Sequence, residues 1–106
     1  MATSPTQYVL RELRKQGYLC QVTEHWNPFA RIRQDLFGFV DVLAIKDGET
    51  LAVQATSRSN VPARVRKIAE HENIGSVREA GWVIQVWGVD KCPKSKKLRA
   101  RIVDVS

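Results

Sequence analysis

Cysteine and long apolar runs are scarce in this sequence, and each scarcity excludes a class of protein. The 106 residues contain two cysteines, Cys20 and Cys92, and two histidines. No CxxC pair and no cysteine–histidine cluster at zinc spacing occurs, so a zinc finger and a disulfide both have little support. No segment has the roughly 18 apolar residues of a membrane span or the apolar core of a signal peptide. We expect one domain, residues 1–106, without a membrane partner and located in the cytoplasm, or in a host's cytoplasm if the gene is viral.

Positive charge is present in excess. Seventeen Lys and Arg residues stand against eleven Asp and Glu, which gives a net charge of +6. The excess is uneven, because residues 61–106 hold ten basic and five acidic side chains. This charge favours a polyanion such as a nucleic acid as partner, although a basic surface without a partner has the same composition.

Periodicity and turn signals predict the order αβββαββ in the α/β (α+β) class. Ser4 and Pro5 begin a helix that Gly17 ends. Asp47-Gly48 is a favoured hairpin turn, and the Asn-Pro of "NPFARIRQD", residues 27–35, indicates a basic loop. A second helix is expected at 61–72. Alternating or apolar runs predict strands at 18–26, 37–46, 49–56, 81–89 and 98–105.

Three tryptophans, Trp26, Trp82 and Trp87, occur in the chain. Packing in the core or at a sheet edge is the ordinary role of such side chains. Trp26 lies beside the basic loop, so it is the candidate for an exposed base-stacking side chain.

Two polar residues interrupt the apolar stretch "FGFVDVLAIKDGETLAVQATSR", residues 37–58. If Asp47 and Gly48 form the turn, Lys46 faces Glu49 and the numbers of every opposed pair sum to 95. Asp41 then faces Gln54 on one side of the hairpin, with Cβ atoms roughly 5 Å apart. Phe39 and Thr56 would form the next pair on that side. The reverse side would be apolar, with the pairs Val40–Ala55, Val42–Val53 and Ala44–Leu51.

A carboxylate buried in such a hairpin costs several kcal/mol unless something compensates its charge. For Asp41 the compensation is a bound cation, a partner arginine or the amide of Gln54. The two residues alone leave all three open.

The arrangement of Asp41, a tight turn, Gln54 and Thr56 resembles the PD-(D/E)xK nuclease superfamily over about residues 4–90. Within it "VDVLAIKDGETLAVQATSR" looks most like archaeal-type Holliday junction resolvases and related phage nucleases. The resemblance implies a restriction-endonuclease-like αβββαβ core, with a central mixed sheet flanked by helices. It implies Asp41 as the main ligand of Mg²⁺ or Mn²⁺, and Gln54 in the place of the second acid. Thr56 stands where the lysine should be.

Two departures from that pattern matter for chemistry. Gln54 offers a neutral amide oxygen to a hard cation, with one negative charge fewer. A hydroxyl at Thr56 can orient a water but cannot offset phosphate charge. Lys67 or Arg64 in the second helix, or Arg58 just beyond the motif, would have to substitute for the lysine. Each of them is as well explained by a solvated surface charge.

Other acids could complete the site. Glu24 is in phase with Cys20 and Val22, and is either a second metal ligand or a surface acid. Asp35 lies near the site or forms a salt bridge within the basic loop, and Glu12 is expected to face solvent.

The function implied is metal-dependent hydrolysis of DNA phosphodiester bonds. The ion would be held by Asp41, the Gln54 carbonyl, Glu24 and a backbone carbonyl such as that of Ala55. The DNA, double-stranded or branched, would be held through its backbone by basic residues, namely Arg31, Arg33, Arg58, Arg64 and Lys67.

Two alternatives stay open. One is a catalytically degenerate nuclease-fold module that binds DNA without cutting it, and the other is a small structural protein in which Asp41 and Gln54 bond each other. A homodimer with paired sites suits a branched substrate, and residues 81–89 could supply an apolar edge for it.

Overall fold

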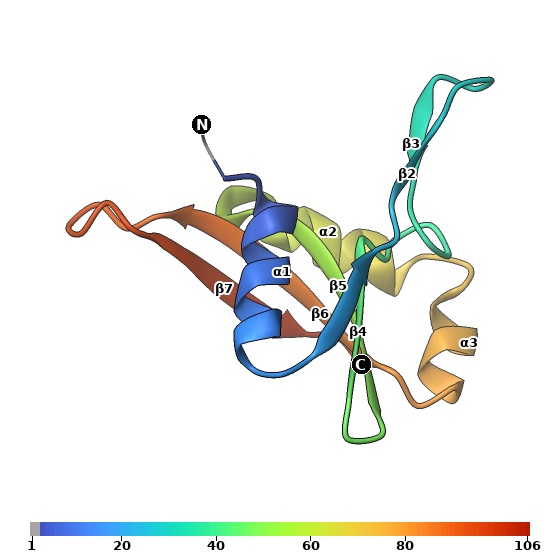
Figure 1. The fold of residues 1–106 in the computed structure, drawn as a ribbon. Helices are drawn as coiled ribbons and strands as arrows, with labels where there is room; N and C mark the ends of the chain where they lie inside the picture. The colour runs from blue at the N-terminus through green and yellow to red at the C-terminus, as the bar shows by residue number, and fades with distance from the viewer. Residues whose placement is uncertain (1–2) are drawn as a thin grey trace.

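The computed structural model describes residues 3–106, which form a mixed sheet of five strands with helices on both faces (Figure 1). Strands β5 and β6 pair in parallel, and the other neighbours pair antiparallel. The predicted α/β class and the mixed central sheet are therefore confirmed. The order across the sheet is β1-β4-β5-β6-β7, whose bounds are Leu19–Val22, Val42–Lys46, Glu49–Ser57, Val83–Lys91 and Leu98–Asp104.

The helices divide the core into two layers. Helix α1, Pro5–Lys15, lies on one face of the sheet, where Val9 and Leu13 pack against Val42, Ala44, Leu51, Val53 and Trp87. Helices α2, Val61–Ala69, and α3, Ile74–Glu79, lie on the other face and pack against Phe39, Ala52, Ile84 and Val86. Each large side chain buried in this way stabilises the fold by roughly 1.5–3 kcal/mol.

Helix α1 begins where the sequence predicts. The Gln7 backbone N–H donates to Ser4 Oγ at 3.2 Å, and the Ser4 backbone N–H donates to Gln7 Oε1 at 3.4 Å. This capping box satisfies backbone donors that the first helical turn leaves without partners.

The predicted hairpin register is confirmed. Val42 faces Val53, Ala44 faces Leu51 and Lys46 faces Glu49. The turn needs two residues with positive φ, and Asp47 and Gly48 adopt 50° and 81°. The side of this hairpin that was predicted to be apolar packs against α1.

The prediction of one strand at 18–26 is wrong, because the chain leaves the sheet at Thr23 and Glu24. The Thr23 N–H donates to the Asp41 carbonyl at 2.8 Å, and Thr23 Oγ1 donates to the Val40 carbonyl at 2.6 Å. The alternating pattern continues past this bend, so it gives no sign of it.

The loop expected at 27–35 is largely a hairpin. Strands β2, His25–Asn27, and β3, Ile32–Gln34, pair antiparallel as a separate two-stranded sheet. We call residues 25–34 the arm, because they project from the body of the molecule (Figure 1).

The strand expected from Phe37 begins only at Val42. Residues 37–39 form a turn that is closed by a bridge between Leu36 and Val40. Phe39 therefore does not pair with Thr56, and Val40 does not pair with Ala55. Both Phe39 and Val40 instead pack in the layer under α2 and α3.

Two further expectations need correction. The second helix ends at Ala69 rather than residue 72, and α3 follows it without having been predicted. Residues 81–89 lie mostly in β6, which is an internal strand, so they provide no free edge for a dimer.

None of the helices in residues 3–106 has the length and apolar character needed to cross a membrane.

Candidate metal centre

Asp41 is buried at the start of the β4–β5 hairpin, with 4% of its surface exposed. Its backbone N–H donates to the Val53 carbonyl at 2.9 Å, which extends the hairpin by one residue. Its Oδ2 accepts two hydrogen bonds, from Gln54 Nε2 at 3.0 Å and from the Ala55 N–H at 2.8 Å. The predicted convergence of Asp41 and Gln54 is confirmed, and these bonds hold the carboxylate in one orientation.

Three carboxylates meet at this point, because the arm begins and ends beside Asp41. Glu24 directly precedes β2 and Asp35 directly follows β3. One oxygen from each of Glu24, Asp35 and Asp41 lies within 4.8 Å of the others. Glu24 and Asp35 thus both lie beside Asp41, and for Asp35 this is the position near the site. A role of either residue as a metal ligand stays a prediction.

The electrostatic cost of this arrangement falls on Asp41. The pKa of its carboxyl is raised from 3.8 to about 7, chiefly by burial and further by a hydrogen bond with Asp35 and the negative charges of Asp35 and Glu24. The hydrogen bond from the Ala55 N–H opposes the shift. A cation at the cluster would remove this cost, because a nearby positive charge favours the ionised form.

Gln54 supplies a second and independent sign of a ligand. Its side chain is 3% exposed, and its Oε1 is the buried side-chain atom without a hydrogen-bond partner in residues 3–106. An unpaired buried carbonyl costs about 1–3 kcal/mol, so native proteins seldom leave one. The amide orientation follows from Asp41, because exchanging the two atoms would place Oε1 against the carboxylate oxygen.

The donor set fits a hard divalent cation. Oxygens that bind the same ion at 2.0–2.6 Å lie no more than about 4–5 Å apart. The three carboxylate oxygens meet this limit, and the neutral Gln54 carbonyl is a further oxygen ligand of the kind that Mg²⁺ and Mn²⁺ accept.

Thr56 and Ala55 lie in β5 beside Gln54. Thr56 is 6% exposed and, two residues along the strand, points to the same face as Gln54. Ala55 supplies its N–H to Asp41, whereas the role of its carbonyl as a metal ligand stays a prediction.

Among the basic side chains predicted for the site, Arg33 is the one that lies beside the carboxylates. Its Nη1 lies 3.4 Å from Glu24 Oε1, so β3 carries a guanidinium to the edge of the cluster. Sequence reasoning placed Arg33 among the DNA-binding residues and did not foresee this pairing. Arg31 is exposed in the turn of the arm.

The other predicted cations lie around α2. Arg58 is 4.0 Å from Asp90, Arg64 is half-buried, and Lys67 is on the exposed side of the helix. None of the three forms an ion pair with Glu24, Asp35 or Asp41 among the ion pairs of the described chain. A role for Lys67 in catalysis, and of all three in DNA binding, stays a prediction.

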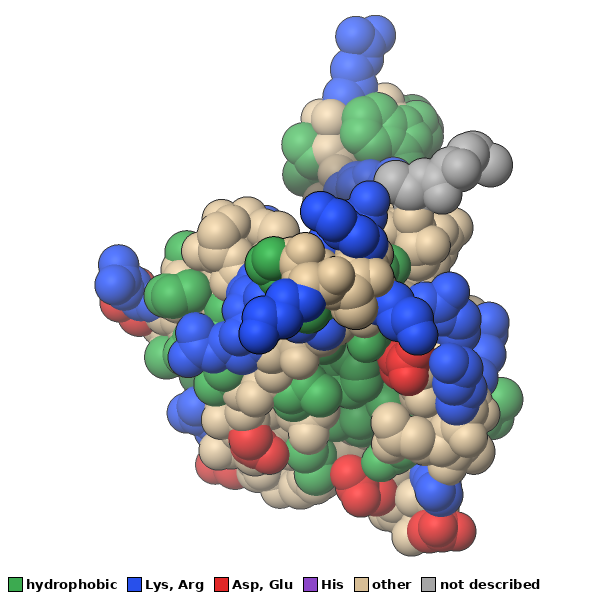
Figure 2. Space-filling view, turned by 90° about the vertical axis from the view of Figure 1, so that its left-hand side faces the viewer, with side chains coloured by type: hydrophobic (Ala, Val, Ile, Leu, Met, Phe, Trp, Pro, Cys, Tyr) green, Lys and Arg blue, Asp and Glu red, His purple; other side chains and the backbone are tan. Residues whose placement is uncertain are grey.

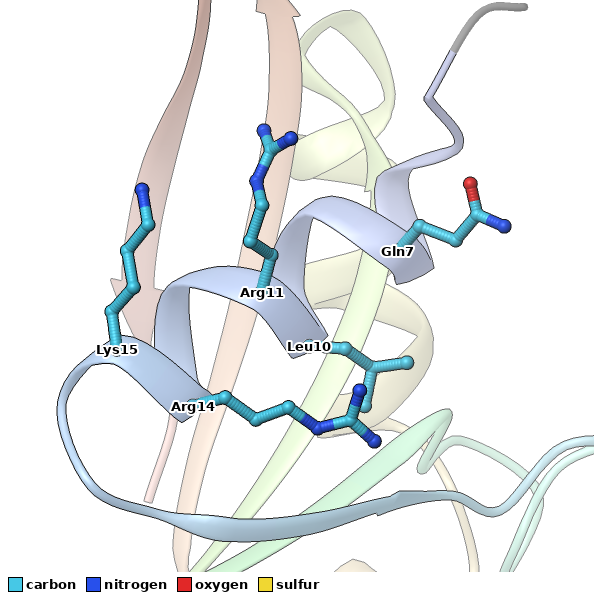
Figure 3. Close-up of a pocket in the computed structure, with 5 residues that line it drawn as sticks. All are labelled: Gln7, Leu10, Arg11, Arg14 and Lys15. Carbon is cyan, nitrogen blue, oxygen red and sulfur yellow. The ribbon is translucent and has the colours of Figure 1, made fainter.

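A basic hollow on α1 was missed by sequence reasoning. Gln7, Leu10, Arg11, Arg14 and Lys15 line it, and the Arg11 and Lys15 side chains extend to the same side of the helix (Figure 3). The spacing of Arg11, Arg14 and Lys15 at i, i+3 and i+4 could have indicated a basic stripe. Glu12, expected to face solvent, pairs with Lys15 at 3.4 Å on the helix surface.

Comparison with known proteins adds no identification. The sequence matches no model of a known protein family and no curated protein.

Proposed function

We propose that this protein is a metal-dependent DNA endonuclease with a PD-(D/E)xK-type core, which hydrolyses phosphodiester bonds at Glu24, Asp35 and Asp41. The observation that carries the proposal is the convergence of three carboxylates beside the unpartnered Gln54 carbonyl. The elements α1, β1, β4, β5, α2 and β6 also follow one another in the αβββαβ order of that superfamily, with the arm and α3 as additions.

Mg²⁺ or Mn²⁺ would be held by Glu24, Asp35, Asp41 and Gln54 Oε1. When bound, the ion supplies a polarised phosphate and a water of lowered pKa. Gln54 and the Ala55 N–H hold Asp41 in place, so its carboxylate needs no reorientation.

Arg33 and Thr56 together replace the lysine that the motif lacks, and each takes one of its two roles. The Arg33 guanidinium, held by Glu24, offsets the charge of the scissile phosphate. The Thr56 hydroxyl lies in β5 on the Gln54 side, where it orients the attacking water.

The DNA backbone is held by a broad basic surface. Figure 2 shows Lys and Arg side chains gathered on the face that carries α1 and the β6–β7 hairpin. Exposed cations on these elements include Arg11, Arg14, Lys15, Lys94, Lys96 and Lys97. Such contacts position DNA without reading its sequence, so the specificity is for the structure of the DNA, duplex or branched. A two-fold dimer would bring two sites to a branched substrate.

The competing candidate is a nuclease-fold module that binds DNA and does not cut it. The observation in its favour is Thr56, since no lysine follows Gln54 in the motif. It predicts DNA binding that is unaffected by loss of the carboxylates.

The test is cleavage of end-labelled duplex, single-stranded, gapped and four-way-junction DNA with Mg²⁺ or Mn²⁺. The wild type should cut at least one substrate only with metal, and Asp41→Asn should cut none while it still binds DNA. Glu79→Gln removes an exposed carboxylate of α3 that forms no ion pair in the described chain, so this variant is the matched control and should cut like the wild type. Binding by all three proteins without cutting would favour the competing candidate.

A further inference from the structure

The arm presents apolar side chains to solvent along its length. It stands above the body of the protein, and hydrophobic, Lys and Arg side chains gather on it (Figure 2). Phe29 is 98% exposed, Trp26 is 57% exposed and Ile32 is 51% exposed. No described part of the chain covers these side chains. Trp26 pairs with Arg33 and Ile32 pairs with Asn27, so Trp26 and Ile32 lie on opposite faces of the arm. Exposed apolar surface on a small projecting element is typical of a binding site.

The turn of the arm holds Phe29 in this position. Asn27 Oδ1 accepts the backbone N–H groups of Phe29 at 3.0 Å and Ala30 at 3.1 Å. Asn27 Nδ2 also donates to Gln34 Oε1 across the hairpin at 3.3 Å. The turn is therefore built by local hydrogen bonds, and the phenyl ring is presented by an ordered structure.

The charge of the arm selects a polyanion rather than a second copy of this chain. Residues 25–34 include Arg31 and Arg33 and no Asp or Glu. A second copy carries the same net charge of +6, which opposes the approach of the arm. Proteins bind single-stranded nucleic acids with aromatic rings interleaved with arginine. The rings stack on bases, and the guanidinium groups bind phosphates.

The position of the arm ties it to the metal centre. Both of its ends lead into carboxylates of the cluster, Glu24 and Asp35. Phe29 is five positions after Glu24, and β2 makes up three of the four residues between them, so the distance from Glu24 to Phe29 is at most about 17 Å. At 3.4 Å per nucleotide this is roughly five nucleotides from the phosphate at the cluster.

We propose that the arm recognises DNA with exposed bases, such as a gap or a branch point, by stacking Phe29 and Trp26 on bases within about five nucleotides of the cleaved phosphate. Intact duplex hides the faces of its bases, and separating a base step costs a few kcal/mol. The arm therefore selects a break in the duplex, and this inference depends on the proposed nuclease function only for where the cut falls.

The experiment measures binding by fluorescence anisotropy in EDTA, where no DNA is cut. The probes are an intact duplex, the same duplex with a two-nucleotide gap, and a four-way junction. Phe29→Ala should weaken binding of the gapped and junction DNA about tenfold or more and that of the duplex less than twofold. Phe29→Tyr should restore the affinity. Leu19→Ala, which removes another exposed apolar side chain (72% exposed) on β1, is the matched control and should bind like the wild type.

Two outcomes overturn the proposal. One is an equal effect of Phe29→Ala on all three DNAs, or none at all. The other is a wild type that elutes as a dimer and a Phe29→Ala variant that elutes as a monomer, which would make the arm a contact between copies.

Cleavage separates this proposal from the proposed function. If the wild type binds gapped DNA through Phe29 but cuts no DNA with Mn²⁺, the proposal for the arm is supported and the proposed nuclease function is wrong. If the wild type cuts DNA with Mn²⁺ and Phe29→Ala does not change DNA binding, only the proposal for the arm is wrong.

Discussion

Replacing Asp41 by Asn should stabilise the metal-free protein, although it removes a residue of the proposed site. The substitution keeps the shape of the side chain, and its amide oxygen can still accept from Gln54 Nε2 and the Ala55 N–H. Its amide nitrogen then donates toward Asp35, where the wild type places one acid against another. The variant removes a buried charge without leaving a hydrogen bond unmade.

The size of this gain follows from the pKa of Asp41, which is about 7 in the folded protein and 3.8 for an unperturbed aspartate. At pH 8 this difference corresponds to roughly 4 kcal/mol, reduced where Asp35 shares the proton. Because the folded pKa is raised, protonation of Asp41 stabilises the fold at low pH. That contribution is lost between about pH 4 and pH 7.

The assay is urea unfolding, followed by tryptophan fluorescence, in EDTA at several pH values. The gain in unfolding free energy of Asp41→Asn over the wild type should be several kcal/mol at pH 8 and should shrink toward zero by pH 4. Asp90→Asn is the control of opposite sign, because Arg99 lowers the pKa of Asp90 and the variant should not be stabilised. A loss of stability in Asp41→Asn at pH 8 would refute the reasoning and make Asp41 a structural group that Gln54 and Ala55 satisfy.

Three more predictions follow from other contacts. Saturating Mn²⁺ should raise the melting temperature of the wild type by several degrees and that of Glu24→Gln by less than half as much; equal shifts in differential scanning fluorimetry would remove Glu24 from the site. Arg33→Gln should weaken DNA binding and lower the slope of log affinity against log salt by about one, and an unchanged slope would show that Arg33 meets no phosphate. Gly88→Ala should cost about 1–3 kcal/mol in urea unfolding, because the added Cβ would overlap Val61 Cγ2 and lie 2.8 Å from Arg58 Cα. Gly75→Ala in α3 meets nothing within 4 Å and should be neutral or stabilising, so equal losses in both variants would contradict the packing argument.

The sequence allowed the pairing of Asp41 with Gln54 to be predicted because local signals determine it. Asp47-Gly48 sets the turn, the turn sets the register, and one apolar side must face the core. Helix α1 was predictable for the same reason, since Ser4 and Pro5 lie at its start.

The positions of Glu24 and Asp35 beside Asp41 could not be assigned from the sequence, because a bend that depends on tertiary contacts brings them there. Thr23 bonds to the backbone of Val40 and Asp41, and the chain leaves the sheet there. Within the basic loop, Asp35 had Arg31 and Arg33 as local partners, but the hairpin gives Arg33 to Glu24 instead. The arm was hidden because Asn-Pro is typical of a loop, and only the folded turn shows Asn27 capping Phe29 and Ala30.

The central claim is that the ion held by Glu24, Asp35 and Asp41 is the one that drives DNA cleavage. The most direct measurement is the initial rate of DNA cleavage as a function of Mn²⁺ concentration for the wild type and Asp35→Asn. The account predicts metal-dependent cutting by the wild type and a half-saturating Mn²⁺ concentration at least tenfold higher for the variant. Cutting with the same Mn²⁺ dependence in both proteins, or no cutting by the wild type at any Mn²⁺ concentration, would contradict it.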